Sequence, residues 1–284
     1  MKRVYLWSLA LAIGLVAAFS ATFVDVYRAS ALDTYAGHAL FVPVFAVVML
    51  WAHRHALRHA AAPGDPRGFL VLAVGVALLA TGRAFELLLV QTLALAVTVA
   101  GATLVLAGRT VTRLAGVPIA FLVLMAPPPR GFIDIVTVYL QSFAATFAVG
   151  VLRLLDVPVL RAGVVLELPN TRLEVAEICN GLRFLFALLV MTVAFAHITQ
   201  RSGARKFILV ASAVPIAILA NASRVAVIAI GAYWVGPEIA GGAVHHMIGK
   251  VVWVLTLGPL ALVAWALSGV SRPHTYRGPT TLGA

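Results

Sequence analysis

The sequence predicts an all-α polytopic membrane protein: about eight transmembrane helices, one interfacial amphipathic helix and a short extracytoplasmic β-hairpin. Three observations carry this prediction. Hydrophobic residues make up 62% of the 284 residues, against roughly 45–50% in soluble globular domains. The mean hydropathy is +1.02. Apolar runs separated by short basic loops recur from Val4 to Leu267, which is typical of helices that cross a bilayer repeatedly.

Eight apolar runs approach the roughly 20 residues that a helix needs to cross a bilayer. They are Val4–Phe23, Ala36–Trp51, Phe69–Gly82, Phe85–Ala107, Leu114–Ala126, Gly181–Ile198, Phe207–Ala222 and Val251–Leu267. Phe69–Gly82 and Leu114–Ala126 are short, and they call for flanking residues or a locally thinner bilayer. The first run follows Lys2-Arg3 and is long enough to be a retained helix, so no cleaved signal peptide is needed.

The basic residues predict the orientation, because Lys and Arg collect in cytoplasmic loops. The cytoplasmic clusters are Lys2-Arg3, Arg54 with Arg58 and Arg67, Arg109 with Arg113, Arg201 with Arg205 and Lys206, and Arg272 with Arg277. Both termini then lie on the cytoplasmic side of a bacterial inner or plasma membrane. This rule also explains the net charge of +11, so we expect membrane lipids and no nucleic acid as partners.

The segment Ile133–Leu155 is long enough to cross, yet the charge rule puts both its ends outside. Its polar residues recur at helical spacing on one side. They are Asp134, Thr137, Gln141, Ser142 and Thr146. We therefore favour an amphipathic helix at the outer interface; the alternative is a ninth crossing whose polar side faces the bundle.

The next segment alternates β-branched and polar residues around Pro169-Asn170-Thr171. It predicts an outer hairpin of Val164–Leu168 with Leu173–Ala176. Such a hairpin is weak alone and has to lean on the bundle or the interfacial helix. We expect one transmembrane domain, residues 1–271, and a disordered cytoplasmic tail, residues 272–284, which is rich in Gly, Pro and Thr.

The chain's only cysteine, Cys179, follows this hairpin at the start of an apolar run. A buried structural thiol is one interpretation. The other is a reactive thiolate, because the unpaired amides of a helix N-terminus lower the pKa of a thiol. Gly181 would allow a substrate to approach the backbone closely. Other polar residues beside Cys179 are Glu177, Asn180 and Arg183.

Two more polar clusters fall at outer ends of later apolar runs. Arg224 lies one helical turn after Asn221 on the same face, which indicates a bundle interior, although snorkelling to the headgroups is the alternative. His245 and His246 stand immediately before the last run, where they are either proton carriers or interfacial anchors.

Together the clusters predict a site in which a thiolate attacks an acyl carbon, an imidazole handles the proton and a cation stabilises the oxyanion. Glu177 and Glu238 are weak candidates to orient the histidine. We expect no cofactor and no metal: adjacent residues such as His245 and His246 diverge by about 100° on a helix. A transporter or lipid-handling permease is the rival class, but it does not explain polar residues that gather at one face.

Three motifs resemble those of the exosortase/archaeosortase family. They are Glu177-Ile-Cys179-Asn-Gly181-Leu-Arg183, Pro215-x5-Asn221-x2-Arg224 and His245-x3-Gly249. Their order and spacing match from about Met125 to Trp253. Asn180 stands where serine is more usual in that family.

The resemblance implies a membrane-embedded cysteine protease or transpeptidase that processes exported proteins, often alongside exopolysaccharide production. Its substrates would carry a C-terminal sorting signal: a short motif such as Pro-Glu-Pro, a transmembrane helix and a basic tail. A thioester acyl-enzyme would pass the protein to a surface acceptor linked to lipid or polysaccharide. By motif, Cys179 would be the nucleophile, Arg224 the anion stabiliser and His245 the general acid/base, with His246 as the alternative.

Overall fold

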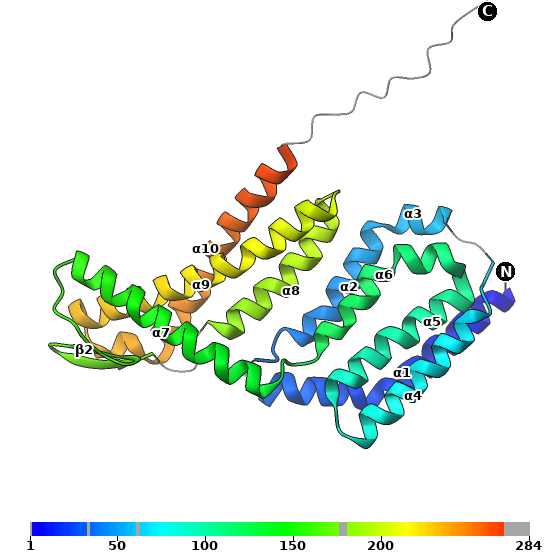
Figure 1. The fold of residues 1–284 in the computed structure, drawn as a ribbon, viewed down its shortest axis with the longest axis horizontal. Helices are drawn as coiled ribbons and strands as arrows, with labels where there is room; N and C mark the ends of the chain where they lie inside the picture. The colour runs from blue at the N-terminus through cyan, green and yellow to red at the C-terminus, as the bar shows by residue number, and fades with distance from the viewer. Residues whose placement is uncertain (1, 33–34, 61–62, 176–180, 270–284) are drawn as a thin grey trace, which may run out of the picture.

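The computed structural model describes residues 2–32, 35–60, 63–175 and 181–269 of the chain (Figure 1). The α-helices, in chain order, are α1 (Lys2–Leu32), α2 (Val42–Ala52), α3 (Arg54–His59), α4 (Arg67–Ala84), α5 (Leu88–Leu114), α6 (Gly116–Phe121), α7 (Arg130–Leu154), α8 (Leu182–Thr199), α9 (Gly203–Trp234) and α10 (Gly242–Gly269). Short 3-10 helices are η1 (Ala39–Phe41), η2 (Leu122–Met125) and η4 (Pro237–Ala240).

Seven helices within the described ranges are long and apolar enough to cross a membrane, which confirms the multi-pass membrane fold. They are α1, α4, α5, α7, α8, α9 and α10. Two shorter apolar segments, Ala39–Ala52 and Gly116–Met125, correspond to two of the predicted crossings. The expectation that the short run Phe69–Gly82 needs flanking residues is confirmed, because α4 takes in two residues on either side and reaches 18 residues.

Helices α4 and α5 form the closest helix pair, because glycines recur every seven residues along α4. A methyl group added at Gly75 would lie 2.3 Å from Thr98 Oγ1, and one at Gly82 would lie 2.9 Å from the Gln91 nitrogen. The same holds at Gly68, where the added atom would lie 2.7 Å from the Val105 nitrogen. Small residues are the usual means of bringing two membrane helices together.

Helix α7 runs across the direction of α8 and α10 in Figure 1 and packs against α9. Its length and composition suffice for a crossing, so the choice between an interfacial helix and a ninth crossing stays a prediction. Part of its polar side meets the sheet. Arg161 donates hydrogen bonds to Ser142 Oγ at 2.9 Å and to Thr146 Oγ1, so these hydroxyls face the sheet.

The predicted hairpin is present and belongs to a three-stranded antiparallel sheet in the order β1-β2-β3. Strand β2 (Val165–Leu168) pairs with β3 (Thr171–Glu174), with Leu166 opposite Leu173. The end of the predicted second strand, Ala176, lies outside the described residues. Strand β1 (Leu160–Ala162) was not predicted, because its three residues are all exposed and show no apolar alternation.

The sheet does lean on the bundle, as expected for so small a hairpin. One apolar cluster joins α7, α9 and the strands. Its buried members are Ala144, Ala145, Ala148, Val149, Leu152, Val157, Val159, Leu166, Leu168, Val175, Ala222, Val225, Ala226 and Ala229. Alanines on both helices allow close approach. The turn is fixed as well, since the Asn170 side-chain amide donates to the carbonyl oxygens of Ala232 and Tyr233 at 3.1 and 3.0 Å.

Two helix boundaries correct the sequence analysis. Helix α9 continues past Ala222 to Trp234, so Arg224 lies inside its helix and not at the outer end. The apolar run has no breaker there, and Pro215 is accommodated within the helix. Helix α10 begins at Gly242, so His245 and His246 lie in its first turns and not before it.

Candidate active site

Arg224 and His245 meet between α9 and α10. Arg224 Nη2 lies 2.7 Å from His245 Nε2, across 21 residues of sequence. A guanidinium only donates hydrogen bonds, so the imidazole accepts at Nε2 and is neutral in this arrangement. Both side chains are half-buried. The Arg224 Nε atom is buried and has no hydrogen-bond partner within the part of the chain that the structure describes, which leaves a donor available to an anion.

Gly249 makes room for the Arg224 guanidinium. It lies one turn after His245 on α10, and a methyl group added there would lie 3.0 Å from Arg224 Cζ. Any side chain at this position would push the guanidinium away from His245. The spacing His245-x3-Gly249 therefore has a direct physical explanation, since residues four apart lie on one helix face.

Gly181 plays a similar part for Asn221. Its φ is +80°, and an added methyl group would lie 2.7 Å from Asn221 Cγ. The Asn221 side chain therefore approaches the Gly181 backbone closely. A non-glycine residue here would be strained in its backbone and would also collide with Asn221.

Cys179, Glu177 and Asn180 lie outside the described residues. Their described neighbours in sequence, Val175 and Gly181, are both held by contacts. The Val175 amide donates to the Val164 carbonyl oxygen at 3.0 Å, and its side chain is buried in the cluster beneath the sheet. Gly181 rests against Asn221.

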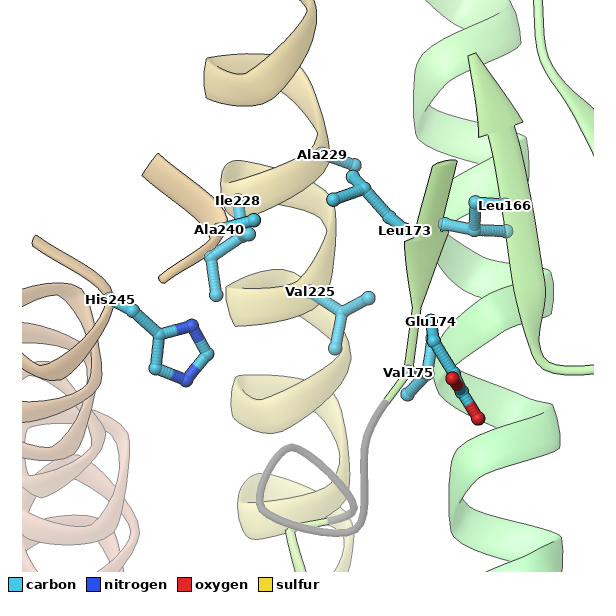
Figure 2. Close-up of a pocket in the computed structure, with 9 residues that line it drawn as sticks. All are labelled: Leu166, Leu173, Glu174, Val175, Val225, Ile228, Ala229, Ala240 and His245. Atoms are coloured by element: carbon cyan, nitrogen blue, oxygen red, sulfur yellow. The ribbon is translucent and has the colours of Figure 1, made fainter. Parts of the chain in front are cut away.

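Each of these neighbours shares a cavity with one of the candidate residues. Val175 and His245 line a small cavity of about 70 Å³ between the sheet, α9 and the start of α10. Figure 2 shows His245 facing this space from one side, with Val225 and Ile228 on α9, and the side chains of Leu173 and Val175 on the strand side. Gly181 and Arg224 line a larger open cleft of about 780 Å³.

The larger cleft, between α8, α9 and α10, gathers most of the remaining candidates. It is lined by Gly181, Arg183, Phe184, Ala187, Asn221, Arg224, His246, Gly249, Lys250, Trp253 and Val254. The rings of His245 and His246 are 5.8 Å apart and nearly perpendicular, so the two histidines face different spaces. Glu238 lies on η4 with its carboxylate over Gly236. The roles of all these residues remain predictions.

Sequence reasoning missed Lys250, Trp253 and Asn170. Lys250 carries a visible signal, since it is a cation within an apolar run. The turn residue Asn170 gives no such signal, because its partners are backbone carbonyls 62 and 63 residues away. Within the described ranges no group of three His, Cys, Asp or Glu residues is placed to hold a metal ion.

Comparison with known proteins gives one match. A family model described as transmembrane exosortase (Exosortase_EpsH) matches residues 27–263, most of the chain. No curated protein and no solved structure matches significantly.

Proposed function

The chain belongs to the transmembrane exosortase family, and on that premise we propose that it is a membrane-embedded cysteine transpeptidase that cleaves the C-terminal sorting signal of exported proteins. The observation that carries the proposal is the 2.7 Å contact between Arg224 and His245. It brings a cation and an imidazole together beside both described neighbours of the Cys179 segment.

The proposed reaction begins at the Cys179 thiol. His245 takes the thiol proton, and the sulfur forms a bond to the carbonyl carbon of the scissile peptide. When the C–N bond breaks, His245 returns the proton to the leaving amine. This step releases the transmembrane helix and basic tail of the substrate. An acceptor amine then attacks the thioester carbon and the C–S bond breaks. The amine proton passes through His245 to the Cys179 sulfur, which restores the thiol and transfers the exported protein to the cell surface.

Arg224 has two roles in this scheme. In the resting arrangement it occupies the lone pair of His245 Nε2. We propose that the guanidinium turns towards the carbonyl oxygen when the substrate binds, which frees Nε2 to accept the thiol proton and leaves the guanidinium beside the oxygen as negative charge develops there. The buried Nε–H of Arg224, which has no hydrogen-bond partner within the described ranges, supports this proposal because it offers a second donor to the oxyanion.

The direct test follows processing of a secreted reporter that carries a Pro-Glu-Pro motif, a transmembrane helix and an Arg-rich tail. Cys179→Ala is expected to leave the reporter full-length. His245→Asn is expected to slow cleavage by at least ~10²-fold, the usual contribution of a general acid/base. The adjacent substitution His246→Asn is the matched comparison and should slow cleavage far less. Continued processing by Cys179→Ala membranes would refute the proposal.

The side of the membrane needs a separate experiment. We propose that the site is extracytoplasmic and that both termini are cytoplasmic, from the distribution of Lys and Arg. Because Cys179 is the only cysteine of the chain, an impermeant maleimide added to intact cells can label the chain only there, and purifying the chain afterwards removes other labelled proteins. Labelling only after the cells are opened would reverse the orientation.

A further inference from the structure

We propose that the protein holds an anionic phospholipid between α2, α8 and α10, with the headgroup on Arg183 and Lys250. The proposal rests on two clefts that have lining residues in common. The 780 Å³ cleft beside Arg224 and a second cleft of about 320 Å³ are both lined by Arg183, Ala187 and Trp253. The inference rests on the shape and charge of these clefts and does not depend on peptidase activity.

The larger cleft is positively charged. Arg183, Arg224 and Lys250 line it, and no Asp or Glu is found among its described lining residues. Neither Arg183 nor Lys250 forms an ion pair with any residue in the described ranges. Both side chains are exposed, so each can reach a ligand in the cleft. Basic pockets between transmembrane helices are a recognised way of binding lipid phosphates.

The second cleft is mainly apolar. It is lined by Gly37, His38, Phe41, Phe45, Arg183, Ala187, Val190, Met191 and Trp253. His38 is buried at 7% exposure, and its Nδ1 lies 3.1 Å from the Tyr35 carbonyl oxygen, so this histidine is already engaged by the backbone. The other lining residues are mainly apolar, which makes the cleft suitable for a hydrocarbon chain.

The two clefts together match one class of molecule. Arg183 stands at their junction, with the cations on one side and the apolar wall on the other. An anionic phospholipid would place its phosphate between Arg183 and Lys250 and one acyl chain along Phe41, Phe45 and Met191. A peptide carboxylate would satisfy the cations but would leave the second, apolar cleft empty, so the combined shape of the two clefts favours the lipid.

Trp253 provides the measurement because it lines both clefts. The full chain in detergent is titrated with brominated phosphatidylglycerol or brominated phosphatidylcholine, and quenching of Trp253 is isolated by subtracting the signal of Trp253→Phe. We expect stronger quenching by phosphatidylglycerol. Arg183→Gln and Lys250→Gln should each weaken this preference by about fivefold, the contribution of one basic residue near a lipid headgroup.

Arg153→Gln is the matched control, since Arg153 is an exposed cation in the last turn of α7 and lines neither cleft. It should keep the wild-type preference. If it removes the preference as strongly as Arg183→Gln does, general charge attraction is the cause and the proposal fails. Equal quenching by the two lipids also overturns it, because Trp253 would then only report contact with bulk lipid.

Competition separates the other possible ligands. Inorganic phosphate should displace the lipid poorly, because it cannot fill the second, apolar cleft. Displacement by phosphate as efficient as that by unlabelled phosphatidylglycerol would contradict the proposal, and so would displacement by an acidic sorting peptide alone. Native mass spectrometry of the unmodified protein gives a readout independent of the variants: retained phosphatidylglycerol with no retained phosphatidylcholine is expected, and equal retention would contradict it.

Discussion

The N-terminal helices α1–α6 and the C-terminal part, α7–α10 with the sheet, are built from equally apolar sequence but treat their polar groups differently. In the first part, Arg83 donates to Thr22 at 3.2 Å and lies 3.8 Å from the Asp25 carboxylate. Gln91 is bound to Thr22 and to the Gly82 carbonyl oxygen. In the second part, Arg224 contacts an imidazole, and Arg183 and Lys250 face a cleft.

This difference separates polar groups that hold helices together from those that we propose serve chemistry or binding. A charged or polar group in a membrane is costly unless it is paired, so it persists for stability or for function. The pairs around Thr22 are complete within the fold, and their loss should lower stability. The cations near Arg224 have no carboxylate beside them in the described ranges, and their loss should lower activity or binding while the fold persists.

The largest effect is expected at Arg224. Arg224→Gln should lower reporter cleavage by about 10²–10³-fold, the usual contribution of an oxyanion donor, while the melting temperature in detergent changes little. Arg205→Gln, at the other end of α9, is the control and should cleave normally. A destabilised Arg224→Gln protein would place this residue with the structural group instead.

The next effect belongs to the close contact of α4 with α5. Gly75→Ala should cost about 1–3 kcal/mol, the usual penalty for overpacking, because the added atom would lie 2.3 Å from Thr98 Oγ1. Gly14→Ala on α1 meets nothing within 4 Å and should not destabilise the protein. The free energies of unfolding of the two variants can be compared by denaturation in mixed micelles. Equal values would show that the α4–α5 contact is loose.

The turn of the hairpin should show a smaller effect on both properties. Asn170→Ala removes two hydrogen bonds to α9 and should cost on the order of 1–2 kcal/mol. Cleavage should also fall severalfold, since β3 leads into the Cys179 segment. Arg172→Gln breaks only an exposed 3.8 Å ion pair with Glu167 and should change neither cleavage nor melting. Normal cleavage by Asn170→Ala would separate the sheet from the active site.

The smallest effect is expected for the ion pair of Arg83 with Asp25. Both side chains are about one-third exposed, so Asp25→Asn should lower stability by less than ~1 kcal/mol and leave cleavage unchanged. Melting curves of the wild-type protein and of Asp25→Asn, recorded at low and at high salt, measure this loss of stability. A loss of cleavage in this variant, with stability intact, would break the division between the two parts of the molecule.

The sequence predicted the fold well where a signal is local. Apolar runs identified the helices, and alternation around Pro169-Asn170-Thr171 identified β2 with β3. Strand β1 was not predicted, because it is defined only by its backbone pairing with β2. The continuation of α9 past Arg224 was not predicted, because a charged residue in an apolar run is usually read as the end of a membrane helix. The partner that accounts for this charge within the helix, His245, is 21 residues further on in the sequence.

The candidate site was predictable as a set of residues but not as an arrangement. The spacing of Asn221 and Arg224 already suggested a shared helix face, and the spacing of His245 and Gly249 matched a motif of the family. The space that Gly181 leaves for Asn221 and the space that Gly249 leaves for Arg224, by contrast, depend on how side chains of one helix approach another segment. The contribution of Lys250 and Trp253 depends on how α8 and α10 pack, which no local pattern reveals.

The central claim is that Cys179 belongs to the same site as Arg224 and His245. It is tested most directly by cross-linking in His245→Cys, which adds one thiol to a chain with only one cysteine. Ser202→Cys, at the start of α9, is the control. Mild oxidation, or a short thiol-reactive cross-linker such as a bismaleimide, should join the two thiols within one His245→Cys chain and should leave Ser202→Cys unlinked. Disulfide formation itself requires Cα atoms within about 7 Å. Two free thiols in the folded His245→Cys protein would contradict the claim.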